Sequence, residues 1–195
     1  MHLFVYLHGF RSSPFSTKSQ LTKQAIDTLI DQGHELSWYG PQLPPSPLDA
    51  MLQIMTYINQ QSYSQLSVIG SSLGGYYATY LAEKYGESCR ATLLNPAIEP
   101  ARDLEKYIGA QNAWHSEDVF YFKSEYICEL QDLYIDQISF PERYQLLAAK
   151  DDEVLDWQEM VGKYLGVNRY ILNDGGHALS NYSEYLSRVL KFHLD

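Results

Sequence analysis

The sequence predicts a compact α/β fold in which a mostly parallel sheet of about six strands carries helices on both faces. Short apolar segments typical of strands alternate with longer segments whose apolar residues have helical spacing. Parallel strands need such crossover helices to return the chain. The first strand segment, residues 3–7, is a continuous apolar run, as expected of a strand buried on both faces.

The expected elements follow one another along the whole chain. Strands are expected at residues 3–7, 36–39, 66–69, 91–94, 144–149 and 169–172. Helices are expected at residues 17–32, 48–60, 76–85, 157–165 and 182–193, with a further helix near 102–108. Gly33 and Gly86 stand where helix C-caps are expected, and the proline-rich residues 41–47 cannot form regular structure.

The length of 195 residues predicts one domain, because it allows one sizeable core and is too short for two ordinary domains. Residues 99–141 break the alternation and are rich in aromatic and acidic side chains. We expect this segment to be a cap-like insertion above the sheet. Its apolar residues either line a substrate cleft or form a layer that only packs on the core, and the pattern leaves both interpretations open.

The charge balance argues against two classes of partner. A net charge of -10, from 24 acidic and 14 basic side chains, repels phosphate backbones and anionic lipid surfaces. We therefore expect neither a nucleic-acid partner nor a membrane partner. No apolar run approaches the ~20 residues of a membrane span, and the start of the chain has no signal-peptide pattern, so a cytoplasmic location is expected.

The two cysteines, Cys89 and Cys128, are far apart and lack Cys-x-x-Cys spacing. They suggest neither a disulfide framework nor a zinc site, and we interpret them as buried or idle thiols. No cofactor or metal is implied by any motif.

One motif points to chemistry. Residues 70–74 read Gly-Ser-Ser-Leu-Gly and match G-x-S-x-G, the nucleophile elbow that lifts a serine hydroxyl clear of a sheet. Here the motif follows a predicted strand and precedes a predicted helix, which is the context that the mechanism needs. An ordinary glycine-rich turn is the less favoured interpretation. Ser71 does not have glycines at the right offsets, so Ser72 is the candidate nucleophile, and an α/β-hydrolase fold is expected.

A serine hydroxyl needs a base, and in this fold the chain order is serine, acid, histidine. His177 follows the last predicted strand and precedes the last predicted helix, where a loop would carry its imidazole over the edge of the sheet. None of His2, His34, His115 and His193 has that position. His177 is therefore the candidate general base.

The acid is expected after the penultimate strand, where residues 151–153 are three adjacent carboxylates. We favour Asp152, on the expectation that Val154 anchors the loop on the core and lets the Asp152 carboxylate turn toward the imidazole. Asp151 is the nearest rival, and Glu99 is a more distant one. The acid would hold the histidine tautomer and stabilise its imidazolium without taking the proton.

An oxyanion hole needs one backbone N–H from the residue after the nucleophile and one from the loop after an early strand. Leu73 and Phe10 occupy those positions. Gly9 would allow the chain to approach the substrate closely, and His8 is expected to be a structural hydrogen-bonding residue and not a second base.

At these residues the chain resembles the YqiA-like esterases, a small bacterial family of compact α/β-hydrolases. The resemblance runs over nearly the whole length and rests on residues 6–14, 41–45, 70–79, 95–97, 152–156 and 176–178. It implies a triad of Ser72, Asp152 and His177, and it favours Asp152 over Asp151 because the matching acid stands directly before Glu-Val. Residues 149–151 depart from the small or glycine-bearing turn expected of the family.

The residues and the resemblance together predict a serine esterase that hydrolyses short- to medium-chain carboxylic esters through an acyl-enzyme on Ser72. An acyl-CoA thioesterase is the alternative within the same class. A non-catalytic binding protein that keeps the hydrolase fold is a third hypothesis, and it is disfavoured because no triad member is missing from the sequence. The expected partner is a small acyl ester or thioester.

Overall fold

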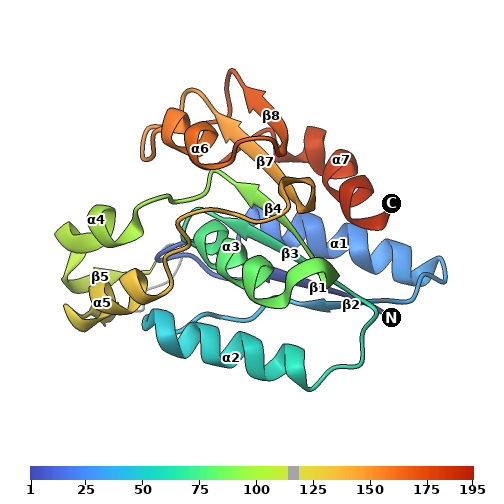
Figure 1. Cartoon of the computed structure of the whole chain (residues 1–195), viewed down its shortest axis with the longest axis horizontal. Coiled ribbons are helices and arrows are strands. Elements are labelled where there is room, and N and C mark those ends of the chain that lie inside the picture. Colours follow the sequence, from blue (N-terminus) through green and yellow to red (C-terminus); the bar gives the residue numbers. More distant parts are fainter. Residues whose placement is uncertain (114–118) are drawn as a thin grey trace.

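The computed structural model describes residues 1–113 and 119–195, and within them six strands form a parallel sheet (Figure 1). The strand order is β2-β1-β3-β4-β7-β8. The strands are β1 (His2–Leu7), β2 (Leu36–Tyr39), β3 (Gln65–Ser71), β4 (Cys89–Leu94), β7 (Tyr144–Ala149) and β8 (Asn168–Leu172). The predicted fold class, a mostly parallel sheet with helices on both faces, is confirmed.

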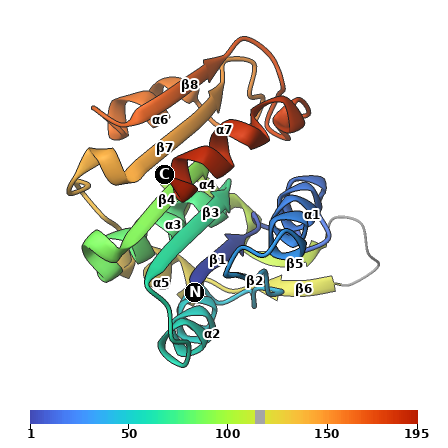
Figure 2. The same ribbon diagram turned by 90° about the vertical axis from the view of Figure 1, so that its right-hand side faces the viewer.

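Two hydrophobic clusters lie on opposite faces of the sheet because successive side chains of a strand alternate. Phe4 and Tyr6 of β1 pack in the cluster that also contains side chains of α1 (Thr17–Asp31) and α7 (Tyr182–Leu194). Leu3 and Val5 pack in the other cluster, with side chains of α2 (Pro47–Asn59), α3 (Leu73–Tyr85) and α6 (Trp157–Lys163). Figures 1 and 2 show the two helical layers. β1 is buried along its whole length, as its continuous apolar run predicts.

The sequence predicted β2 and β7 with their correct bounds, but it placed the start of α3 at Tyr76. The helix begins at Leu73, directly after the turn at Ser72. Gly74 and Gly75 therefore belong to the first helical turn and not to a loop. They suggested a loop because glycine is a poor helix former, whereas here the packing of the helix requires them.

Gly70 and Gly74 allow α3 to lie against the ends of β1 and β3. A Cβ on Gly74 would lie 2.0 Å from the carbonyl oxygen of Leu7, and a Cβ on Gly70 would lie 2.0 Å from the carbonyl oxygen of Gly74. Both distances are far shorter than any real contact of that kind, so no other residue fits at these two positions without a shift of the backbone.

Residues 99–141 contain structure that the pattern did not predict. They include α4 (Pro100–Leu104), a 3-10 turn (Glu105–Tyr107), an antiparallel pair formed by β5 (Gly109–Asn112) and β6 (Val119–Phe122), and α5 (Glu125–Asp132). A helix was expected near 102–108, whereas α4 ends at Leu104 and the 3-10 turn follows it. β5 is composed of Gly, Ala, Gln and Asn, which have low strand propensity, so only its pairing with β6 makes it a strand.

This segment packs against the loop that follows β1. The ring of Phe10 lies 5.2 Å from that of Phe122, 5.8 Å from that of Phe120 and 5.7 Å from that of Tyr107, measured between ring centroids. Arg11 Nε donates a hydrogen bond to the carbonyl oxygen of Asn112 at 2.6 Å. The β1–α1 loop and the β5–β6 pair thus pack directly against each other.

Gly74→Ala is expected to lower the free energy of unfolding by more than about 3 kcal/mol, because its Cβ meets backbone that no side-chain rotation can move. Gly162→Ala is the matched control, since Gly162 lies in α6 with nothing within 4 Å of its Cβ position. It should gain up to about 1 kcal/mol of helix propensity. Urea denaturation measures both changes, and equal effects would contradict the close approach at Gly74.

Candidate active site

Ser72 lies in a sharp turn between β3 and α3, with φ 55° and ψ -120°. The backbone of any residue other than glycine is strained in this conformation. The turn is held by backbone hydrogen bonds: Ser72 N–H donates to the carbonyl oxygen of Leu94 at 3.0 Å, and the Ser72 carbonyl accepts from the N–H groups of Gly75 and Ala97 at 2.9 and 3.0 Å. The strand, the turn and the helix expected around this serine are all present.

His177 lies in the loop between β8 and α7, and its imidazole connects two residues that are far away in the sequence. Its Nε2 is 3.1 Å from Ser72 Oγ, and its Nδ1 is 2.9 and 3.1 Å from Asp152 Oδ2 and Oδ1. The Asp152 side chain is fully buried and the His177 side chain is 23% exposed. A buried carboxylate fixes the proton on Nδ1, which leaves Nε2 as the acceptor for the Ser72 hydroxyl.

The three adjacent carboxylates after β7 each bind a different group of the His177 loop. Asp151 Oδ1 accepts the N–H of Gly176 at 2.9 Å, and Glu153 Oε2 accepts the N–H of His177 at 2.9 Å. Asp152 contacts the imidazole itself. The nearest rival acid, Asp151, is therefore a ligand of the loop backbone in this structure.

The expectation that Val154 anchors the acid loop on the core is wrong. Val154 is 58% exposed, and it is Leu155 that packs against the core. The loop is instead fixed by Asp152, whose Oδ1 accepts the N–H groups of Val154 and Leu155 at 2.8 and 2.9 Å. These bonds form a turn, and a turn does not keep the alternating side-chain directions of a strand.

Two further residues that the sequence did not single out hold the His177 loop. The Asn95 side chain is fully buried, and its Nδ2 donates to the carbonyl oxygens of Gly176 and His177 at 3.0 and 3.3 Å. Lys18 Nζ, on the first turn of α1, donates to the carbonyl oxygen of Ala178 at 2.6 Å. Burial lowers the pKa of Lys18 to about 8, and the nearby Asp152 opposes this change. A sequence signal could have pointed to Asn95, which stands at the end of a central strand and before a proline, whereas nothing in the sequence marks Lys18.

Phe10 and Leu73, the two expected oxyanion-hole residues, line one cavity. Leu73 is the first residue of α3, so its N–H has no acceptor within the helix and points along the positive end of the helix dipole. The Phe10 loop approaches the serine closely, since a Cβ on Gly9 would lie 3.0 Å from Ser72 Cβ. Both amides therefore belong to the immediate surroundings of Ser72.

His8 has the structural role expected from the sequence. Its Nδ1–H donates to the carbonyl oxygen of Gly9 at 2.9 Å, and its Nε2 accepts the N–H of Leu43 at 3.0 Å. Burial lowers the pKa of His8, and this keeps the ring neutral. The loop after β1 is thus tied to the loop before α2.

The remaining histidines lie away from Ser72 or outside the described residues. His2 Nε2 is 2.7 Å from Ser67 Oγ, and His193 Nε2 is 2.9 Å from Thr92 Oγ1, both in the interior. His34 is exposed. His115 lies in residues 114–118, which the structure does not describe.

The cavity at Phe10 and Leu73 has a volume of about 630 Å³. Apolar side chains form much of its wall, and polar side chains form the rest. Its lining includes Phe10, Leu43, Pro44, Leu73, Tyr77 and Phe120. Gly9 and Leu73, which adjoin Ser72, are among its lining residues, so this cavity lies next to the turn that carries the serine.

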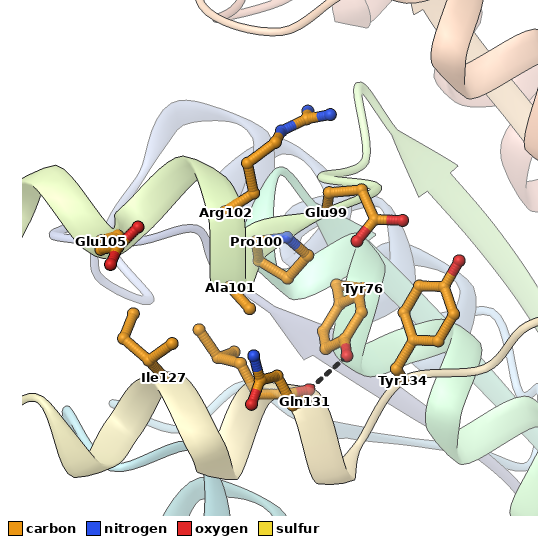
Figure 3. Close-up of a pocket in the computed structure, with 10 residues that line it drawn as sticks. Tyr76, Glu99, Pro100, Ala101, Arg102, Glu105, Ile127, Gln131 and Tyr134 are labelled. Carbon is orange, nitrogen blue, oxygen red and sulfur yellow. Dashed lines mark hydrogen bonds between the residues drawn. The ribbon is translucent and has the colours of Figure 1, made fainter.

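A second cavity, of about 470 Å³, lies between α4 and α5 (Figure 3). Glu99, the more distant rival for the acid, lines this cavity together with Arg102 and Tyr134. In Figure 3 the Glu99 carboxylate lies beside the Tyr134 ring. The structure therefore assigns Glu99 to a different part of the molecule from the imidazole of His177.

Within residues 1–113 and 119–195, no three His, Cys, Asp or Glu side chains are grouped so that they could hold a metal ion. Cys89 is a buried free thiol and Cys128 an exposed one. None of the helices in the described part of the chain is long and apolar enough to cross a membrane.

The parallel sheet, the strained serine turn and the loop after the last strand define an α/β-hydrolase-fold protein. A family model described as "Uncharacterised protein family (UPF0227)" matches residues 3–194. The chain belongs to this family, which is the YqiA-like family that its motifs resemble.

Solved structures support the fold at low sequence identity. Est1E from Butyrivibrio proteoclasticus, solved with ferulic acid, aligns with a TM-score of 0.75 at 12% identity over 100% of this chain and 90% of that one. Alpha/beta hydrolase domain-containing protein 10 from mouse aligns with a TM-score of 0.71 at 12% identity over 97% and 89%. A methylesterase from Arabidopsis aligns with a TM-score of 0.60 at 14% identity over 98% and 100%.

The strain at Ser72 predicts a difference between two substitutions that both remove the hydroxyl. Ser72→Gly should be more stable than Ser72→Ala by about 1 kcal/mol, because glycine adopts the observed φ and ψ without strain but loses more chain entropy on folding. Thermal or urea unfolding of the pair measures the difference. If the alanine variant is the more stable of the two, the turn is not strained.

Proposed function

We propose that this protein is a serine hydrolase that cleaves carboxylic esters through an acyl-enzyme on Ser72. The observation that carries the proposal is the continuous hydrogen-bonded path from Ser72 Oγ through the His177 imidazole to the buried Asp152 carboxylate. A serine hydroxyl becomes an effective nucleophile when such a base takes its proton. Esterase and hydrolase names among proteins of the same fold are consistent with this class.

In the first half of the reaction, Ser72 Oγ attacks the ester carbonyl carbon and its proton passes to His177 Nε2. The carbonyl oxygen becomes an oxyanion that accepts hydrogen bonds from the N–H groups of Phe10 and Leu73. The bond between the carbonyl carbon and the alcohol oxygen then breaks, and His177 gives its proton to the departing alcohol. Asp152 stabilises the imidazolium throughout and stays ionised.

In the second half, His177 Nε2 takes a proton from a water molecule, whose oxygen attacks the acyl carbon. A second tetrahedral oxyanion forms at the same two amides. Its collapse breaks the bond to Ser72 Oγ, which recovers the proton from His177. The products are a carboxylic acid and an alcohol, and the protein returns to its starting state.

The cavity of about 630 Å³ beside Ser72 is the proposed substrate pocket. Its volume is within the ordinary range for small-molecule sites, which suits a short- to medium-chain or single-ring substrate. Residues 99–141 would then act as a cap within a single domain, because Phe120 lines this pocket and the β5–β6 pair contacts the Phe10 loop. Acyl-CoA thioesters remain the alternative substrates, since the same nucleophile attacks a thioester carbonyl.

Ser72→Ala is expected to abolish hydrolysis of p-nitrophenyl butyrate and covalent labelling by a fluorophosphonate probe, while circular dichroism shows an intact fold. Release of p-nitrophenol measures the first effect and mass spectrometry the second. Full turnover by the Ser72→Ala variant would mean that another residue is the nucleophile. Failure of the wild-type protein to label or turn over would favour a non-catalytic binding protein.

Asp152→Asn is expected to lower kcat by a factor on the order of 10³–10⁴, because the amide no longer holds the tautomer that accepts the serine proton. Asp151→Asn is the matched control, since its side-chain oxygen still accepts the N–H of Gly176. It should change kcat less than about tenfold. Steady-state kinetics on p-nitrophenyl butyrate measure both, and a larger loss for Asp151→Asn would exchange the roles of the two acids.

A further inference from the structure

Tyr77 is a buried phenol that lines the cavity beside Ser72. It stands four residues after Leu73 on α3, so the two side chains lie on the same face of the helix, about 6 Å apart along its axis. Tyr77 is only 2% exposed. A substrate held at the Leu73 amide and extending along this face would therefore meet Tyr77 about one helical turn away.

The Tyr77 hydroxyl makes no hydrogen bond in the described residues 1–113 and 119–195. Some other side-chain oxygens and nitrogens among the described residues have neither a partner nor accessible surface, and the Tyr77 oxygen is not one of them. Its oxygen therefore keeps access to open space although the side chain is almost wholly buried. The cavity beside Ser72 is the space that this side chain lines.

Several other buried tyrosines of this protein have paired hydroxyls, and the Tyr6 hydroxyl, which has no partner among the described residues, differs from that of Tyr77 in having no accessible surface. Tyr76 donates to the carbonyl oxygen of Leu130 at 2.5 Å, and Tyr164 shares a hydrogen bond of 2.7 Å with Thr79. Buried hydroxyls are generally paired, because an unpaired one loses its bonds to water without a replacement. The pairing that Tyr77 lacks among the described residues is available to a ligand in the cavity.

Two other polar side chains of the cavity lining, Gln53 and Gln42, already bind protein atoms. Gln53 Nε2 donates to the carbonyl oxygen of Gln42 at 3.3 Å, and the Gln42 amide nitrogen lies 3.2 Å from His8 Nε2. Burial raises the pKa of Tyr77, with smaller contributions from Tyr76 and Glu129 in the same direction. The Tyr77 hydroxyl thus stays neutral and able to donate at any ordinary pH.

We propose that the Tyr77 hydroxyl selects esters whose acyl group is mainly apolar but carries a neutral hydroxyl or carbonyl oxygen at its distal end. The inference rests on the proposed esterase function and names the substrate class of the same site. The aromatic and aliphatic wall would hold the apolar body of the acyl group, and Tyr77 would bond the distal oxygen. A site built to bond such an oxygen rejects the analogue that lacks it, because its own polar group is then left unpaired.

The test compares two p-nitrophenyl esters of equal size, those of 3-(4-hydroxyphenyl)propanoic acid and 3-(4-methylphenyl)propanoic acid. The wild-type protein should prefer the hydroxyl ester by about tenfold in kcat/KM, the ratio expected for one hydrogen bond of ordinary strength. In Tyr77→Phe the ratio should fall to about one or below, because an apolar pocket favours the methyl group. Tyr80→Phe, on the same helix and outside the cavity lining, should keep the wild-type ratio.

A wild-type ratio at or below one, or a ratio that Tyr77→Phe leaves unchanged, would overturn the inference. Hydrolysis of p-nitrophenyl butyrate without hydrolysis of either aryl ester would also overturn it, and the proposed esterase function would stand. If the same preference appears only when the ring is on the alcohol side, in butanoate esters of the two matching alcohols, the assignment of the cavity to the acyl group is wrong. Absence of turnover with every ester would remove the proposed function itself.

Discussion

The contact between the start of α3 and the end of β1 is the constraint on which the site depends. Gly74 lies so close to the Leu7 carbonyl that a single methyl group there would overlap the backbone. This contact lets α3 begin directly at Leu73, without an intervening loop, and holds Ser72 in its strained turn above the carboxyl ends of the strands. The hydroxyl of Ser72 and the free N–H of Leu73 are then presented together at one edge of the sheet.

The second requirement is a fixed loop for His177, and four side chains from three other parts of the chain meet it. Asp151 and Glu153 bind the N–H groups of Gly176 and His177, and Asn95 and Lys18 bind the carbonyl oxygens on the same stretch. Loops are normally the mobile part of a fold, whereas an imidazole that transfers a proton has to keep hydrogen-bond distance on both sides. The buried Asp152 carboxylate supplies one of those contacts and Ser72 the other.

The segment of residues 99–141 connects this rigid centre to the substrate pocket that we propose. Its strand β6 contributes Phe120 to the cavity wall, and its aromatic side chains pack around Phe10, which follows the close approach of Gly9 to Ser72. A change in this segment would therefore act on the shape of the pocket and on the Phe10 loop at the same time. Tyr77 also lines this cavity, from helix α3, so the hydroxyl that we infer to be selective is carried by the same helix that begins at Leu73.

Local patterns in the sequence determined the alternation of strands and helices, the bounds of β2 and β7, and the serine turn, because these depend on neighbours within one element. The order of elements along a parallel sheet then placed the loops that carry Ser72, Asp152 and His177 at one edge. The contacts of Asp151 and Glu153 with the His177 loop and the contributions of Asn95 and Lys18 are different in kind, since they depend on which loop atoms each side chain meets. The weak strand β5, the exposure of Val154 and the unpaired hydroxyl of Tyr77 likewise follow only from contacts between residues distant in the chain, which no local pattern records.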